Sequence, residues 1–181
     1  MKLGLALSGG GFRASLFHVG VLARLAELFT VEAMPFTGKT EPAVRAKFLQ
    51  ALQSAESGSA HVMGLITRGE SRYDLLTLNA AGMARLGPSA RERLDVSILQ
   101  QVVFREVMRM TPQDEERLIY IKDTDEVLAT VTKGAGELGV ILTPTKITEV
   151  KDVARAGDRM PHKSTYFYPK PLTGLVINAM D

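Results

Sequence analysis

The sequence predicts an α+β fold with a mixed sheet, a hairpin, packed amphipathic helices and some β-α-β character. Short apolar runs of strand length alternate with segments whose apolar residues recur at helical spacing. Two β-prone runs flank Arg68-Gly69-Glu70-Ser71, which predicts the hairpin. In a chain of 181 residues, a hydrophobic content of 45% is ample for a core.

The first 28 residues predict a strand, a loop and a helix. Residues 3–7 form a short apolar run, three glycines interrupt it, and residues 14–28 are long enough for a helix. That helix is apolar on nearly all sides, so we expect it to be buried.

From residue 29 onward the pattern changes to regularly alternating elements, after a break at Pro35, Gly38 and Pro42. We expect residues 29–181 to form the packed core, with residues 1–28 attached and residues 3–7 completing one sheet edge. The expected elements are a helix that Thr40 caps and that runs to about residue 54, strands 61–67 and 73–78, a helix over 95–108, a strand over 118–121, a helix begun by Asp123 and Glu126 and ending before Gly134, a strand over 138–142, a helix over 147–156 stopped by Gly157, and a last strand over 174–178.

Composition excludes several classes of site. The chain has no cysteine, which rules out disulfides and thiolate metal sites, and its histidines, His18, His61 and His162, show no ligand spacing with carboxylates. We interpret His61 as a half-exposed strand residue and expect no metal or other cofactor. A net charge of +2, spread along the chain, gives no general affinity for nucleic acid or membranes. Without a signal-like or membrane-spanning run, the expected location is cytoplasmic.

The glycine loop has the makings of an oxyanion hole, formed by Gly9, Gly10, Gly11 and Arg13. Glycine lets successive backbone N–H groups face one point, and the positive end of the following helix favours a developing anion there.

Residues 5–13, Leu-Ala-Leu-Ser-Gly-Gly-Gly-Phe-Arg, followed by His18-Val19-Gly20-Val21-Leu22, resemble the opening of patatin-like phospholipases. The resemblance covers about the first 28 residues and implies an acyl hydrolase whose oxyanion hole is the glycine loop. It also implies a serine in G-x-S-x-G and an aspartate in D-G-[GA], and the chain contains neither motif. The sequence therefore supplies no complete catalytic site of this type.

Two other interpretations of the glycine loop stay open. Gly9-x-Gly11-x-x-Ala14, with Glu32 about 20 residues further on, fits a dinucleotide-binding fingerprint. In the structural interpretation, the glycines only let a buried helix pack close to a strand.

A second candidate site lies in residues 160–170, where basic, hydroxyl and aromatic side chains stand near two prolines. Lysine and hydroxyl groups bind phosphate through charge-assisted hydrogen bonds, and a tyrosine ring offers a flat face to a base or sugar. The structural alternative is a connector with solvated lysines. The candidate ligand-binding residues are Lys163, Ser164, Thr165, Tyr166 and Lys170.

The same segment, Met160-Pro161-x-Lys163-Ser164-Thr165-Tyr166-Phe167-Tyr168-Pro169-Lys170 and then residues 173–178, resembles the C-terminal signature of the domain of unknown function 1015 family. Residues 94–99 and 141–145 agree with it, and the resemblance covers residues 29–181. That family has no settled reaction. Its D-G-H-H-R motif belongs to an N-terminal half, and no His-His pair occurs in this chain. A gene fusion or a truncated protein would each produce such a combination.

Three functional hypotheses follow. The first is a non-catalytic or incomplete protein that binds a phosphorylated small molecule or nucleotide, or a protein that supplies the missing half. The second is a patatin-like serine acyl hydrolase with a nucleophile outside the known motif. The third is a nucleotide-binding module that uses the glycine loop. If the chain is an enzyme at all, we expect an acyl hydrolase or a nucleotide-dependent transferase.

Overall fold

A computed structural model describes residues 4–7 and 12–165, with side chains described from residue 20 to residue 165. Its strands form one sheet in the order β2-β4-β3-β6-β1-β5, and every neighbouring pair is antiparallel. The strands are β1 (Gly4–Leu7), β2 (Phe29–Pro35), β3 (Val62–Thr67), β4 (Arg72–Leu78), β5 (Ile119–Ile121) and β6 (Leu138–Leu142).

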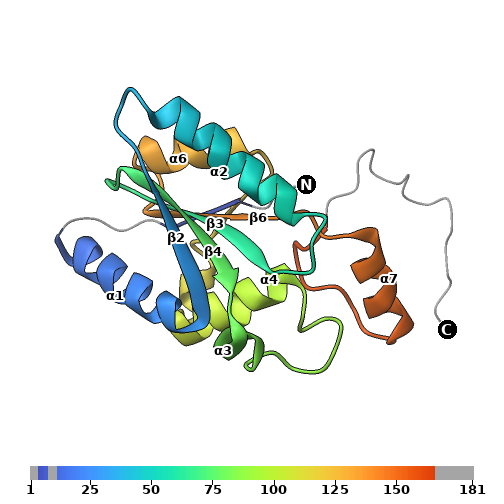
Figure 1. The fold of residues 1–181 in the computed structure, drawn as a ribbon. Coiled ribbons are helices and arrows are strands. Elements are labelled where there is room, and N and C mark those ends of the chain that lie inside the picture. The colour runs from blue at the N-terminus through green and yellow to red at the C-terminus, as the bar shows by residue number, and fades with distance from the viewer. Residues whose placement is uncertain (1–3, 8–11, 166–181) are drawn as a thin grey trace, which may run out of the picture.

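Helices cover both faces of this sheet (Figure 1). On one face lie α2 (Glu41–Ala55) and α6 (Thr124–Thr132). On the other face lie α1 (Phe12–Leu28), α3 (Ala80–Met83) and α4 (Asp95–Ile98), which continues into the π-helix η1 (Leu99–Val107). The short α5 (Pro112–Glu115) precedes β5, and α7 (Ile147–Arg155) lies beside the sheet rather than on it (Figure 1).

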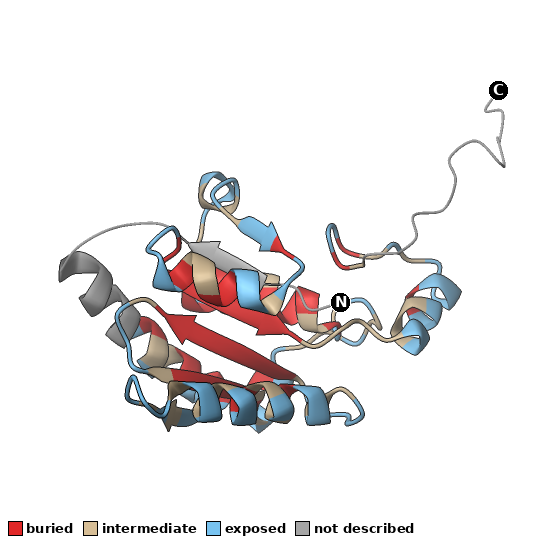
Figure 2. Cartoon of the chain, turned by 90° about the horizontal axis from the view of Figure 1, so that it is seen from above, coloured by how far each residue is buried: buried red, intermediate tan, exposed pale blue. Residues whose placement is uncertain are grey.

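The core consists of two apolar clusters, one on each face of the sheet. The strands β3, β4 and β6 are almost wholly buried between the helices (Figure 2). Phe48 and Leu52 of α2 pack on one face with Val127 and Val131 of α6. The opposite cluster joins α1, α4 and η1 to the sheet through Leu25, Ile98, Val103, Phe104, Met63 and Leu76.

The α+β class is confirmed, and the expected mixed sheet is wrong because all described strand pairs are antiparallel. The β-α-β character appears in a split form. β2 and β3 run parallel with β4 between them and α2 connecting them, and β5 and β6 likewise flank β1 with α6 as the connection. An inserted antiparallel strand gives a β-α-β sequence pattern without any parallel neighbours.

The expectation that residues 3–7 complete a sheet edge is also wrong. β1 lies between β6 and β5 and pairs with both. The helix that follows is part of the core, with Leu25 fully buried, and Arg24 donates from Nη1 to the Val107 carbonyl oxygen at 3.0 Å. Residue 28 is followed directly by β2, so no linker separates the segments that carry the two family resemblances.

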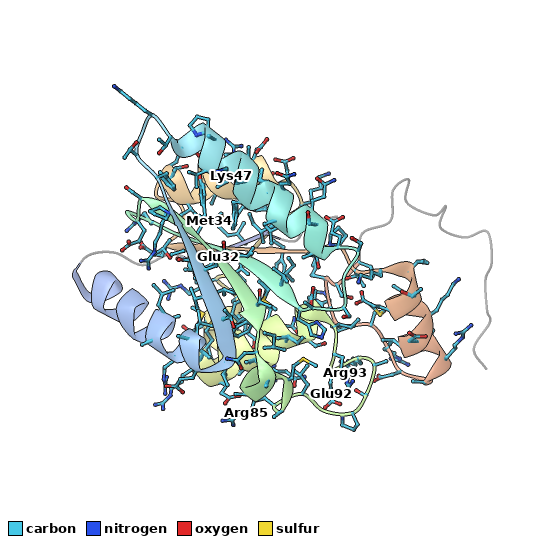
Figure 3. The ribbon with its side chains drawn as sticks, in the orientation of Figure 1. Glu32, Met34, Lys47, Arg85, Glu92 and Arg93 are labelled. Atoms are coloured by element: carbon cyan, nitrogen blue, oxygen red, sulfur yellow. The ribbon has the colours of Figure 1, made fainter. Side chains whose placement is uncertain are left out.

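β2 is a strand that the sequence analysis did not predict. It forms the edge of the sheet opposite β1 and β5, and it carries Glu32 with an exposed side chain (Figure 3). A dinucleotide fold of the expected kind places its first two strands side by side in parallel. Here three strands separate β1 from β2, so Glu32 is remote from the strand that precedes the glycine loop.

Most other expected elements are present at nearly the predicted bounds. The hairpin is β3 and β4, and Gly69 in its turn has a φ of 81°, a conformation that favours glycine. Thr40 occupies the N-cap of α2, but its hydroxyl accepts a hydrogen bond from the Thr37 amide instead of capping α2. The helix over 95–108 is confirmed, although it is π-helical from Leu99 to Val107. The strand expected at 174–178 lies outside the described residues.

Candidate functional site

The described residues next to the two candidate sites predicted from sequence lie at opposite ends of the sheet. β1 ends at Leu7, which pairs with Leu138 beside Thr67, and the glycine segment continues the chain from that end. The Lys163 segment is attached at the other end, where β6 finishes at Leu142.

Gly9, Gly10 and Gly11 lie outside the described residues. Arg13 belongs to the first turn of α1, and its side chain is likewise outside the description. The oxyanion-hole interpretation therefore stays a prediction.

The Lys163 segment is described as far as Thr165, and a buried serine holds it in place. Ser164 is 5% exposed, and its hydroxyl donates to the Pro161 carbonyl oxygen at 2.6 Å. The Thr145 hydroxyl donates to the Ser164 carbonyl oxygen at 2.9 Å, which fastens the segment to the chain after β6. Thr165 is half-buried. Tyr166 and Lys170 lie outside the described residues.

Lys163 itself has an exposed side chain and a φ of 59°. For a residue other than glycine, this left-handed conformation costs about 1 to 2 kcal/mol, so surrounding contacts must hold it. The hydrogen bonds of the adjacent Ser164 are those contacts. The backbone conformation at Lys163 is thus held by its neighbours, while the lysine side chain itself is exposed.

A hydrogen-bonded group that the sequence analysis missed lies at the same end of the sheet. His61, just before β3, bonds through Nδ1 to Asp95 Oδ1 at 2.7 Å. The Thr143 hydroxyl donates to Asp95 Oδ2 at 2.8 Å. The side chains of His61 and Asp95 are 15% and 18% exposed. His61 is therefore a partly buried residue that directly precedes β3, and its carbonyl oxygen accepts from the Leu78 amide of β4 at 2.9 Å.

The three residues of this group come from distant parts of the chain, and no local motif joins them. The sequence indicates the Asp95–Thr143 contact only indirectly, because both residues fall within segments that carry the second family resemblance. Those segments, 94–99 and 141–145, meet through the Asp95–Thr143 bond, and the second of them meets 160–165 through the Thr145–Ser164 bond.

Exposed basic residues occur in the segments that meet at this end of the sheet. Arg91 pairs with Asp158 at 3.2 Å, which ties the segment before α4 to the segment after α7. Figure 3 shows Arg93 and Glu92 in the segment that leads into α4. The exposed basic or titratable side chains here are Arg91, Arg93, Arg159, His162 and Lys163.

The opposite end of the sheet contains a buried carboxylate with an unsatisfied oxygen. Asp74 of β4 is 2% exposed, and its Oδ2 accepts from Arg72 Nε at 3.2 Å. Its Oδ1 and the Thr67 hydroxyl are buried without a hydrogen-bond partner in the described structure. Burial raises the pKa of Asp74 above its ordinary value, and the Arg72 guanidinium partly opposes that rise.

In the described part of the chain, no group of three or more His, Cys, Asp or Glu side chains is placed to hold a metal ion. None of the described helices combines the length and the hydrophobicity needed to cross a membrane.

No protein-family model matches this chain, and neither the curated proteins nor the solved structures contain a match. Both family resemblances therefore remain predictions from the residues that carry them.

Proposed function

We propose that this protein binds a phosphorylated small molecule or nucleotide at the end of the sheet where the Lys163 segment lies. The observation that supports this proposal is the convergence of segments 94–99, 141–145 and 160–165 through side-chain hydrogen bonds. The residue types of the third segment favour phosphate binding, and several exposed basic residues occur in the segments at the same end of the sheet.

Lys163 is the central residue of this proposal. A lysine ammonium donates up to three hydrogen bonds to phosphate oxygens, and the Lys163 side chain is exposed. Thr165, beside it, adds a hydroxyl donor.

The proposal is tested by titrating inorganic phosphate, ATP and phosphoserine into the full chain by calorimetry and by NMR shift mapping. Lys163→Ala is expected to weaken binding by about tenfold to hundredfold, since a hydrogen bond to a charged group contributes about 1.5 to 3 kcal/mol. Lys163→Arg keeps the charge and should retain most of the affinity. A Lys163→Ala, Lys170→Ala double variant extends the test to the second predicted lysine.

Lys133→Ala is the matched control, because this exposed lysine lies at the C-terminal end of α6, where Gly134 contacts Arg68 at the opposite end of the sheet. It should bind like the wild type. Equal binding by the wild type and Lys163→Ala would overturn the proposal. Shifts that map to residues 9–13 would instead favour the glycine loop as the binding site.

A further inference from the structure

The hydrogen bonds of Asp95 fix the orientation of the His61 ring. Asp95 uses Oδ1 for His61 Nδ1 and Oδ2 for the Thr143 hydroxyl, so both of its oxygens are engaged. Because a carboxylate only accepts hydrogen bonds, the proton of a neutral His61 ring lies on Nδ1. The lone pair of the ring then lies on Nε2.

The Nε2 atom of His61 has no hydrogen-bond partner among the described residues. It is also not one of the buried side-chain atoms without a partner there, which are Thr67 Oγ1 and Asp74 Oδ1. Most of the His61 side chain is covered, with 15% of it exposed. Within the described structure, the nitrogen that carries the lone pair is thus unpaired, while Nδ1 is held by Asp95.

A carboxylate behind an imidazole stabilises the positive charge that develops when Nε2 forms a new bond. In catalytic triads, a serine or cysteine lies in front of Nε2. Here no described hydroxyl group bonds to Nε2, so the imidazole itself is the available nucleophile.

We propose that His61 accepts a phosphoryl group at Nε2 from a small-molecule phosphodonor. The choice of a phosphoryl group rests on the proposed function, since the exposed cations at this end of the sheet favour a phosphorylated ligand. The nucleophilic character of His61 rests only on its own geometry with Asp95 and Thr143.

The transfer balances with phosphoramidate as the donor. The Nε2 lone pair forms a bond to phosphorus, the P–N bond of phosphoramidate breaks, and ammonia leaves with the electron pair. The proton on Nδ1 stays in its hydrogen bond to Asp95, which faces the positive charge of the phosphorylated ring. No oxidation or reduction takes place.

The experiment incubates the full chain with phosphoramidate and locates the acid-labile phosphoryl group by mass spectrometry and by ³¹P NMR. We expect modification of His61 at Nε2 in the wild type and its loss in His61→Gln. Lys133→Ala is the matched control, because Lys133 is exposed at the opposite end of the sheet, away from the segments that would bind the phosphodonor. It should leave the labelling of His61 unchanged.

Asp95→Asn tests the role of the carboxylate. An asparagine amide donates to Nδ1 and moves the ring proton to Nε2, so labelling should slow by at least about tenfold. Thr143→Val keeps the Asp95–His61 bond and should have a smaller effect, which provides a second variant if Asp95→Asn unfolds.

Labelling of His18 or His162 with His61 unlabelled would overturn the proposal, and so would unchanged labelling in folded Asp95→Asn. The hydrogen bonds of Asp95 would then serve only to fasten α4 to the ends of β3 and β6. Phosphate affinity that depends on Lys163 without labelling of His61 would sustain the proposed function and reject this inference. Labelling of His61 without phosphate affinity that depends on Lys163 would support this inference and reject the proposed function.

Discussion

Replacing Asp74 with asparagine is expected to stabilise the protein at neutral pH. The carboxylate is 2% exposed, its Oδ1 has no hydrogen-bond partner, and its Oδ2 has the Arg72 contact at 3.2 Å. A buried charged group with an unsatisfied oxygen costs more than about 1 to 3 kcal/mol. Arg72 offsets part of this cost, but its side chain is 34% exposed, so solvent screens the pair.

Asparagine keeps a polar atom at this position and removes the buried charge, so we expect a net gain of about 1 kcal/mol in the free energy of unfolding at pH 7. For a chain of this size, such a gain raises Tm by about 2 to 4 °C.

The contribution of Asp74 to the free energy of unfolding depends on pH. Because burial raises the pKa of Asp74 in the folded state above 3.8, the folded protein retains a proton that the unfolded chain has released. The stability contribution of the protonated carboxyl is therefore fully present below pH 3.8. It is lost as the pH rises through the folded pKa.

Urea unfolding of the wild type and Asp74→Asn across this pH range measures the difference directly. The difference should be small below pH 3.8, grow as the pH rises, and then become constant. Asp152→Asn, at an exposed position of α7, should differ from the wild type by less than about 0.5 kcal/mol. A less stable Asp74→Asn at pH 7, or a difference independent of pH, would refute the reasoning.

Two further predictions concern the core. Gly64→Ala places a Cβ atom 2.4 Å from Phe48 Cζ and 2.9 Å from Leu52 Cδ1, so urea unfolding should show that the free energy of unfolding falls by about 1 to 3 kcal/mol. Gly38→Ala is the control, because no atom lies near its new Cβ, and its stability should change little. A Gly64→Ala variant as stable as the wild type would show that α2 is displaced at little cost. Deletion of residues 1–28 removes β1 from between its two partner strands and takes Leu25 from the core. We therefore expect circular dichroism of the shortened protein to show no cooperative unfolding transition. A cooperative transition would instead show that residues 29–181 fold as an independent unit.

The elements that the sequence predicted well are those with a local cause. The helix over 41–55 follows from the spacing of Val44, Phe48 and Leu52, and α7 ends before Gly157, whose φ is 71°. β2 escaped prediction because it begins directly after the last residue of α1, with no turn residue to mark the change. Its neighbour β4 follows only after α2 and β3, which no local pattern indicates.

The candidate site was predictable only in part, for the same reason. The residue types around Lys163 indicate phosphate chemistry by themselves, but the left-handed conformation of Lys163 depends on contacts made by Ser164 and Thr145. His61 lies 34 residues from Asp95, and Asp95 lies 48 residues from Thr143. Each was unremarkable in its own segment, because the chemistry arises only when the strand ends meet.

The position of β1 affects the order in which the strands of the sheet pair during synthesis. β1 is made first, yet its two partner strands, β5 and β6, are the last two strands of the described sheet to leave the ribosome. Until residues 138–142 emerge, the backbone donors and acceptors of β1 have no sheet to join, while β2, β4 and β3 can already pair among themselves. Pairing of β1 with its two partners is therefore a late event in synthesis, and a ribosome stalled before β6 holds a nascent chain in which β1 is still available to a chaperone.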